Sequence, residues 1–236
     1  MRAVFTLTVR QLAGSRRSWL VLGLAALPIL AAALFRIAET TTTPREYADE
    51  ITASLVASAI LPLVMLLLGV VTFGNEVSDR TLVYLTTKPL ARWRIVVPKL
   101  AATLLVGGLP VAVSGAVAIA VIEQGDLGGA LATGGGLLAG AAAYAAIFTW
   151  AGLALRHALV AGLVYVFVWE AVLAAYLDGI RFLSVRRFAL SVVNGLDAER
   201  LTDAELGAGA ATVGVLLVLA GFTALAVRKL ARMDVP

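Results

Sequence analysis

The chain has 236 residues, of which 61% are hydrophobic and 14% are charged, and its mean hydropathy is +0.95. A soluble domain carries roughly 25% charged residues, so this composition excludes a soluble globular protein. The absence of cysteine excludes disulfides and thiolate metal sites, and the single histidine, His157, excludes a multi-histidine metal site within one chain. The net charge of +4 comes from basic residues beside apolar segments, which indicates membrane topology rather than nucleic-acid binding.

Residues 1–17 precede the first apolar segment. Val4, Leu7 and Leu12 alternate at helical spacing with Arg2 and Arg10. This pattern predicts an amphipathic helix that lies in the membrane interface. A signal peptide is the alternative, but the apolar core of a signal peptide is not usually preceded by an amphipathic helix of this kind.

Six apolar segments follow, each long enough to be a membrane-spanning helix. A helix needs about 17 to 25 apolar residues to cross a hydrocarbon core about 30 Å thick. The predicted spans are residues 18–35, 51–75, 100–122, 127–155, 158–177 and 206–227. The connections are too short for a separate soluble core. The sequence therefore predicts an all-α membrane protein with a single transmembrane domain, residues 1–236.

The positions of Lys and Arg predict the orientation of these spans. Positive residues concentrate in the N-terminus, in the connections after the second and fourth spans, and in the C-terminus. Short loops rich in Lys and Arg stay in the cytoplasm. We therefore expect a multi-pass protein of the cytoplasmic (inner) membrane with both termini cytoplasmic and the lipid bilayer as its surroundings.

Proline and glycine mark places where the spans bend or pack closely. Pro28, Pro62 and Pro110 each remove a backbone hydrogen bond, which predicts either a local change of helix shape or a hinge for alternating access. Gly136 and Gly140 form a GxxxG spacing, which favours close helix contact inside the bundle or between protomers.

Glu170 is an ionisable residue well inside a predicted span. At 1.5 Å per residue it lies about 20 Å from the cytoplasmic end of the fifth span. A carboxylate at that depth is costly unless it is protonated, paired or facing water. Two interpretations remain open: Glu170 lines a substrate or proton pathway, or it is a hydrogen-bonded packing residue beside Trp169.

The connection between the second and third spans is longer than a bare link requires. Ser78 or Asp79 can cap a short helix on which Leu82 and Leu85 share a face, and Pro89 would end that helix. A helix with an apolar face that projects from the membrane is suited to dock a cytoplasmic partner.

This connection resembles that of the permease subunits of ABC-2 type transporters, which are type 2 ATP-binding cassette exporters. The matching positions are Glu76, Thr81, Leu82, Leu85, Lys88, Pro89, Arg92 and Lys99. The family often has glycine where Arg80 and Pro98 stand, so the local turn geometry differs. The six spans, the cytoplasmic termini and the amphipathic N-terminal helix also agree with the family.

The resemblance implies a coupling helix that a cleft on a separate ATPase subunit receives. The implied docking residues are Glu76, Asp79, Arg80, Thr81, Leu82, Leu85, Lys88, Pro89 and Arg92. The chain has no G-x-x-x-x-G-K-[ST] phosphate loop, so the partner would bind ATP and Mg, and this chain would be a non-catalytic subunit without a cofactor of its own. Two permease protomers, in a homodimer or a heterodimer, would face each other around the exported substrate.

The connection before the last span, residues 178–205, is too apolar for a solvated loop and too short to cross the membrane twice. The family resemblance implies a re-entrant or interfacial helical hairpin on the outer side. An amphipathic helix on the outer leaflet is the equal alternative.

The sequence supports two other functions less well than a permease. A self-contained ion- or proton-coupled transporter could use Glu170, but it would not need the long docking connection and would be expected to show internal repeats. An intramembrane serine hydrolase would need a buried base, whereas His157 stands beside Arg156 at the edge of a span.

Overall fold

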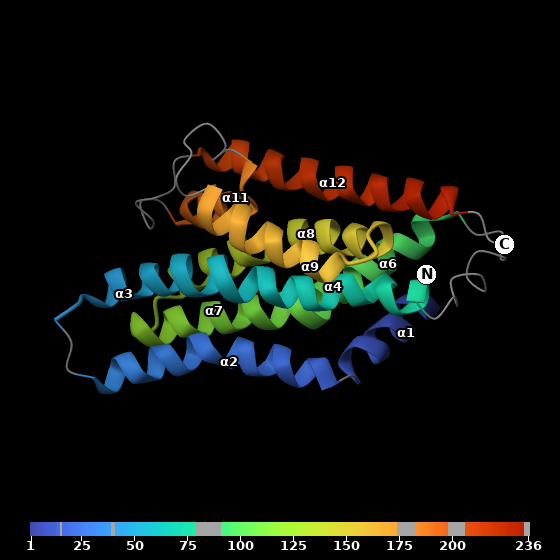
Figure 1. Ribbon diagram of the computed structural model, residues 1–236. Helices are drawn as coiled ribbons and strands as arrows, with labels where there is room; N and C mark the ends of the chain where they lie inside the picture. The colour runs from blue at the N-terminus through green and yellow to red at the C-terminus, as the bar shows by residue number, and fades with distance from the viewer. Residues whose placement is uncertain (15, 39–40, 79–90, 174–182, 198–205, 234–236) are drawn as a thin grey trace.

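The computed structural model describes residues 1–14, 16–38, 41–78, 91–173, 183–197 and 206–233. Within these ranges all regular structure is helical, which confirms the predicted class. The long helices run side by side along one axis, and the N-terminus and the C-terminal end of α12 lie at the same end of the bundle (Figure 1).

Among the residues that the structure describes, five helical stretches are long and apolar enough to cross a membrane. They are α2 (Arg16–Ile37), the run from Pro44 to Gly74, the run from Trp93 to Ile122, α8 (Leu127–Ala154) and α12 (Ala208–Arg232). The second stretch comprises α3 (Pro44–Glu50), η1 (Ile51–Ile60) and most of α4 (Leu61–Ser78), and the third comprises α6 (Trp93–Thr103), η2 (Leu104–Gly108) and α7 (Leu109–Ile122). Each of the five overlaps a predicted span.

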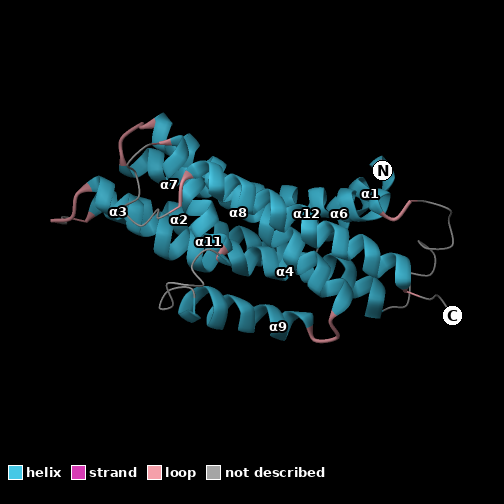
Figure 2. Cartoon of the chain, turned by 90° about the horizontal axis from the view of Figure 1, so that it is seen from above, coloured by secondary structure: helices cyan, strands magenta, loops and turns pink. Residues whose placement is uncertain are grey.

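The fifth predicted span, 158–177, is described only in part. It begins at Ala158 as predicted, with α9 (Ala158–Val164) followed by the π-helix η3 (Tyr165–Leu173). Residues 174–177 lie outside the described chain, and the apolar helix that is described is shorter than a full span. It runs along one edge of the bundle (Figure 2).

The other predicted elements are found with shifted ends. The N-terminal helix α1 (Arg2–Ala13) stops before Gly14. The connection after the first span contains α3, whose Thr43 and Glu46 form a reciprocal capping box with Pro44 in the first turn. The third span starts at Trp93 rather than at residue 100, because Lys99 is buried inside the helix instead of standing in a loop.

The prolines lie within helices that continue past them. Pro28 lies inside α2, whereas Pro62 and Pro110 stand just after the π-helices η1 and η2. A proline has no N–H, and its ring crowds the carbonyl four residues before it. The wider π-turn accommodates that ring. The structure thus shows a local change of helix shape, and the hinge role stays a prediction.

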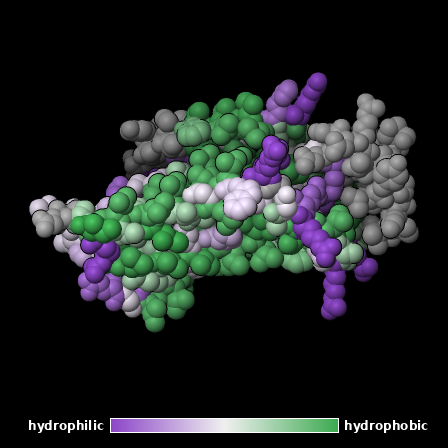
Figure 3. Space-filling view, turned by 90° about the horizontal axis from the view of Figure 1, so that it is seen from below, coloured by the Kyte–Doolittle hydropathy of each residue, from purple (hydrophilic) through white to green (hydrophobic). Residues whose placement is uncertain are grey.

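The bundle is built around α8. It packs against α4, α7, α11 (Val185–Leu196) and α12, and 67% of its apolar window is buried. The corresponding fractions are 22% in α2 and 17% in α12, so these two helices present most of their surface to the surroundings. Hydrophobic side chains cover most of one face of the molecule, and hydrophilic ones gather toward its ends (Figure 3). This distribution suits a bilayer as solvent.

Glycines let neighbouring helices approach α8 closely. A Cβ atom on Gly136 would lie 2.6 Å from the carbonyl oxygen of Ala189, and one on Gly140 would lie 2.8 Å from the Cβ of Ala189. The GxxxG spacing is therefore used inside the chain, where it seats α11 on α8.

Substitution of Gly152 by alanine is expected to destabilise the bundle by about 1–3 kcal/mol. The new Cβ would lie 2.4 Å from the carbonyl oxygen and 2.9 Å from the Cα of Val70, so α4 and α8 would have to separate. Thermal unfolding in detergent, followed by tryptophan fluorescence, measures this loss. Gly23→Ala is the matched control, because nothing lies within 4 Å of its Cβ position. Equal unfolding temperatures for both variants would contradict the close contact.

Candidate functional site

The predicted docking connection leaves the bundle between α4 and α6. The structure describes Glu76 near the end of α4 and Arg92 just before α6. The other predicted docking residues lie outside the described chain: Asp79, Arg80, Thr81, Leu82, Leu85, Lys88 and Pro89. What the structure shows is therefore the base from which this connection extends.

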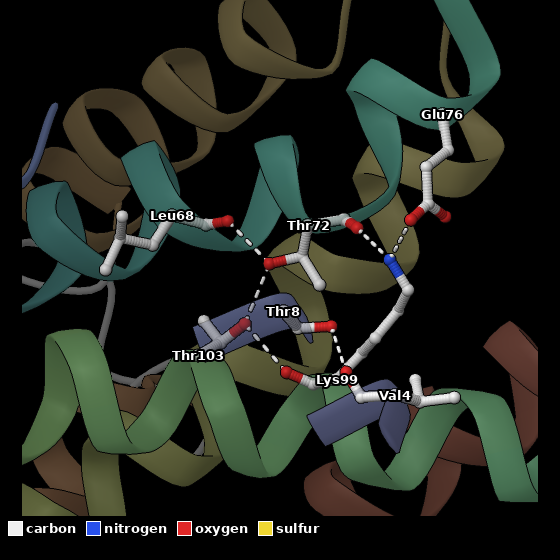
Figure 4. A network of polar contacts seen from close by, with 7 residues as sticks. All are labelled: Val4, Thr8, Leu68, Thr72, Glu76, Lys99 and Thr103. Atoms are coloured by element: carbon white, nitrogen blue, oxygen red, sulfur yellow. Dashed lines mark hydrogen bonds and ion pairs between the residues drawn. The ribbon is translucent and has the colours of Figure 1, made fainter. Parts of the chain in front are cut away.

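A buried ion pair joins the two helices at that base. The Nζ atom of Lys99 lies 2.6 Å from Oε1 of Glu76 and also donates to the carbonyl oxygen of Thr72 at 2.6 Å (Figure 4). The side chain of Lys99 is 1% exposed and that of Glu76 is 12% exposed. The ammonium group also lies 4.6 Å from the centre of the Phe73 ring. A cation this deeply buried persists because a counter-ion, a carbonyl and an aromatic face surround it.

Two threonines extend the contact one turn deeper. The hydroxyl oxygens of Thr72 and Thr103 lie 2.8 Å apart, and both residues are buried. Each hydroxyl oxygen also lies within hydrogen-bond distance of the carbonyl oxygen four residues earlier, at 2.7 Å for Thr72 and Leu68 and at 3.0 Å for Thr103 and Lys99, so the two hydroxyl protons are shared among three contacts (Figure 4). A threonine in a helix satisfies its hydroxyl in this way. We call the set Thr72, Glu76, Lys99 and Thr103 the α4–α6 clamp.

The N-terminal helix packs against the same region. α1 contacts α6, and Thr8 is buried, with its hydroxyl donating to the carbonyl of Val4 at 2.8 Å. At the other end of α1, the hydroxyl of Ser18 in α2 bonds the carbonyls of Leu12 and Ala13. The last carbonyls of a helix have no partner within the helix itself, and a side-chain donor can satisfy them. α1 therefore packs against the helix that carries Lys99 and Thr103, and hydrogen bonds from Ser18 connect α1 to α2.

Glu170 lies in η3, where it is 3% exposed, and its carboxylate accepts three hydrogen bonds. The hydroxyl of Tyr165 and the backbone N–H of Val185 each donate to Oε1 at 3.0 Å, and the hydroxyl of Ser184 donates to Oε2. Ser184 is also the N-cap of α11, since its Oγ accepts from the N–H of Arg187. Glu170 thus holds the start of α11, where a negative charge is favoured by the helix dipole.

Two predictions concern this region: the helical segment before the last span, and the role of Glu170. α11 begins beside Glu170 and is buried against α8 and α12 along most of its length, so it lies within the bundle rather than on a surface. The rest of the predicted hairpin, 178–182 and 198–205, lies outside the described residues. Glu170 occupies a hydrogen-bonded packing position, and its pathway role stays a prediction.

Several residues of these two sites were missed from sequence alone. A charge beside an apolar run favours a loop position for Lys99, and apolar composition alone gives no role to Tyr165, Ser184 or the paired threonines. For Thr72 and Thr103 the sequence does carry a signal, because hydroxyl side chains inside apolar spans often form hydrogen bonds between helices. Ser184 just before a helical pattern was a usable signal for an N-cap.

The fold defines a polytopic helical membrane protein with a polar clamp at the base of one connection. A comparison with protein families matches residues 15–177 to the ABC-2 family transporter protein. The chain therefore belongs to the ABC-2 transporter family, whose members form the membrane part of ABC transporters. Membership implies an ABC ATPase partner and a place in the membrane. A search of curated proteins finds none that matches the chain.

Proposed function

We propose that this chain is the permease subunit of an ABC exporter driven by a separate ATPase subunit, which binds ATP and Mg. It spans the cytoplasmic membrane six times, with α9 and η3 as part of the fifth span and both termini in the cytoplasm. It pairs with a second permease protomer around the substrate route. Family membership and the apolar bundle support this proposal.

The α4–α6 clamp is the observation that carries it. A docking segment transmits force only if its base moves as a unit with the spans. Here the 2.6 Å ion pair and the Thr72–Thr103 contact join the two helices that bracket the segment, and α1 packs against α6. Push or rotation delivered by the ATPase at residues 76–92 would therefore reach the second and third spans together.

A second feature of the clamp also supports docking. Oε2 of Glu76 is buried, and no donor among the described residues reaches it. A buried carboxylate oxygen without a donor costs free energy. In the assembled transporter we expect this oxygen to accept a hydrogen bond from the docking segment or from the ATPase.

The secondary-transporter alternative finds less support. It requires a carboxylate that exchanges partners during transport. Glu170 instead bonds three donors that belong to its own helix and to the start of α11. Such a group is better suited to hold a structural element than to carry an ion.

The test replaces residues 81–88 by a Gly/Ser linker of equal length and measures co-purification with the product of any neighbouring gene that encodes an ABC ATPase. The linker variant is expected to lose the ATPase, because the apolar face of the coupling helix is removed. The control replaces residues 39–42, in the connection at the opposite end of the bundle, by a Gly/Ser linker of the same length as the residues removed. This control should retain the ATPase. Equal retention of the ATPase by both variants would refute the docking role.

A further inference from the structure

A groove of 630 Å³ opens between α6 and α12, with α8 as its floor. On α6 its wall is formed by Val97, Leu100 and Ala101, and on α12 by Ala220 and Ala224. The floor is made by alanines of α8 that pack against these helices. The groove is therefore apolar: five alanines leave open space between the leucines of α6, η2 and α12, and an apolar space of this kind suits a hydrocarbon chain.

The groove follows the helix axes within one leaflet. Its wall on α12 extends from Leu216 to Ala224, which is roughly 12 Å at 1.5 Å per residue, against a hydrocarbon core of about 30 Å. Leu216 and Val97 at its rims are 56% and 41% exposed, so the groove opens sideways to the surroundings of the bundle. It is placed to be entered from the bilayer.

Two arginines stand one turn beyond the same end of the groove. Arg94 precedes Val97 by three residues on α6, and Arg228 follows Ala224 by four residues on α12, so each shares a helix side with a groove residue. Both are exposed, and among the described residues neither forms an ion pair. Arg94 lies over the ring of Trp93, with its Cζ 5.5 Å from the ring centre, and a tryptophan is typical of the membrane interface.

We propose that this groove binds an acyl chain of an anionic phospholipid, with the headgroup phosphate held by Arg94 and Arg228. The lipid belongs to the leaflet at the end where α1 and the C-terminal end of α12 lie (Figure 1). Juxtamembrane Arg residues attract anionic headgroups, and arginine bonds phosphate with paired donors. A second copy of the chain fits less well, because it would bring its own Arg94 and Arg228 against this basic end.

The bound lipid would fill a space between α6, which carries Lys99 of the clamp, and α12. It would thus sit beside the helix that the docking segment leads into. The assignment goes beyond the proposed function and does not require the ATPase.

The experiment is native mass spectrometry of the full-length protein released from nanodiscs that contain equal amounts of phosphatidylglycerol and phosphatidylcholine. Wild type is expected to retain phosphatidylglycerol in preference to phosphatidylcholine. Ala220→Phe, which fills the groove from an exposed position, is expected to lose both lipids. The control Leu217→Phe adds an equal ring on the exposed side of α12 and should retain them.

The headgroup contact is tested separately. Arg94→Gln and Arg228→Gln are each expected to reduce the preference for phosphatidylglycerol about fivefold while leaving chain binding intact. Lys229→Gln removes an exposed charge next to Arg228 and is the matched control. If Ala220→Phe fails to fold, Val97→Phe fills the groove from the other wall.

Three results would overturn the proposal. They are equal retention of the two lipids by wild type, unchanged retention in the groove-filling variants, and a change in oligomeric state caused by Ala220→Phe, which would show a second copy in the groove. Co-purification of the ATPase is measured on the same variants. Lost lipid preference with intact ATPase binding confirms the lipid site alone, and unchanged lipid retention with intact ATPase binding refutes the site while the proposed function stands.

Discussion

Replacement of Glu76 by glutamine is expected to destabilise the protein by about 3–5 kcal/mol, because it leaves a buried ammonium group without its counter-ion. Lys99 is 1% exposed, and in the variant its ammonium group would keep the uncharged carbonyl oxygen of Thr72 as an acceptor but have no anionic partner among the described residues. The free energy of unfolding in mixed detergent micelles measures the loss. Lys229→Gln on α12 is the control and should change stability by less than about 0.5 kcal/mol, because Lys229 is exposed.

The double variant Glu76→Gln with Lys99→Met separates the pair from its surroundings. It is expected to recover much of the stability lost in the single variant, since the unpaired charge is gone. The charge swap Glu76→Lys with Lys99→Glu should recover little, because a carboxylate at position 99 would face the carbonyl oxygen of Thr72. Additive losses in the double variant would show that the two side chains do not interact.

The same variants test the clamp as a mechanical link. On the proposed function, Glu76→Gln is expected to keep the ATPase bound, since residues 81–88 are unchanged, and to lower the transport achieved for each ATP hydrolysed. The measurement compares ATP hydrolysis and transport in the same proteoliposomes. Proportional loss of hydrolysis and transport would place the defect in docking instead.

Replacement of Glu170 by alanine is expected to cost about 3 kcal/mol and to release the start of α11. The substitution leaves three donors without an acceptor: the hydroxyls of Tyr165 and Ser184 and the N–H of Val185. Hydrogen exchange of α11 measures the release directly, and the first turn should exchange fastest. Glu170→Gln keeps one acceptor oxygen and should cost about 1 kcal/mol.

Two controls separate anchoring from a pathway role. Ser184→Ala removes one donor but leaves the carboxylate, so an anchoring role predicts faster exchange at the start of α11 with transport retained. If Glu170→Gln folds normally and transports at the wild-type rate, only the packing role remains. If it folds normally with unchanged exchange in α11 but loses transport, Glu170 lines the pathway and the anchoring interpretation is wrong.

The helices could be predicted from the sequence because the signal is local. A long apolar run has no alternative to a helix in a bilayer, so among the described residues five apolar helices overlap predicted spans, with ends that differ from the predicted ones by up to seven residues. The partners of the polar residues could not be predicted in this way. Lys99 meets a carboxylate 23 residues earlier in the chain, and Glu170 meets Ser184, 14 residues later. Such pairs depend on which helix faces pack together, and apolar composition does not specify that.

The charged residue inside the third span shows this most clearly. Lys99 reads as the end of a loop because a charge beside an apolar run normally marks the interface. Its burial depends on Glu76 and Phe73, both on the preceding helix. The missed capping box at Thr43 and Glu46 was, by contrast, visible in the sequence pattern.

The outward faces of α2 and α12 make the protein convenient for spectroscopy. Leu34 on α2 and Leu217 on α12 are 66% and 68% exposed. Because the sequence contains no cysteine, one cysteine introduced at either position can carry a spin label or fluorophore without any background thiol to remove. Paired labels on the two helices would report distances across the bundle with and without the proposed ATPase partner.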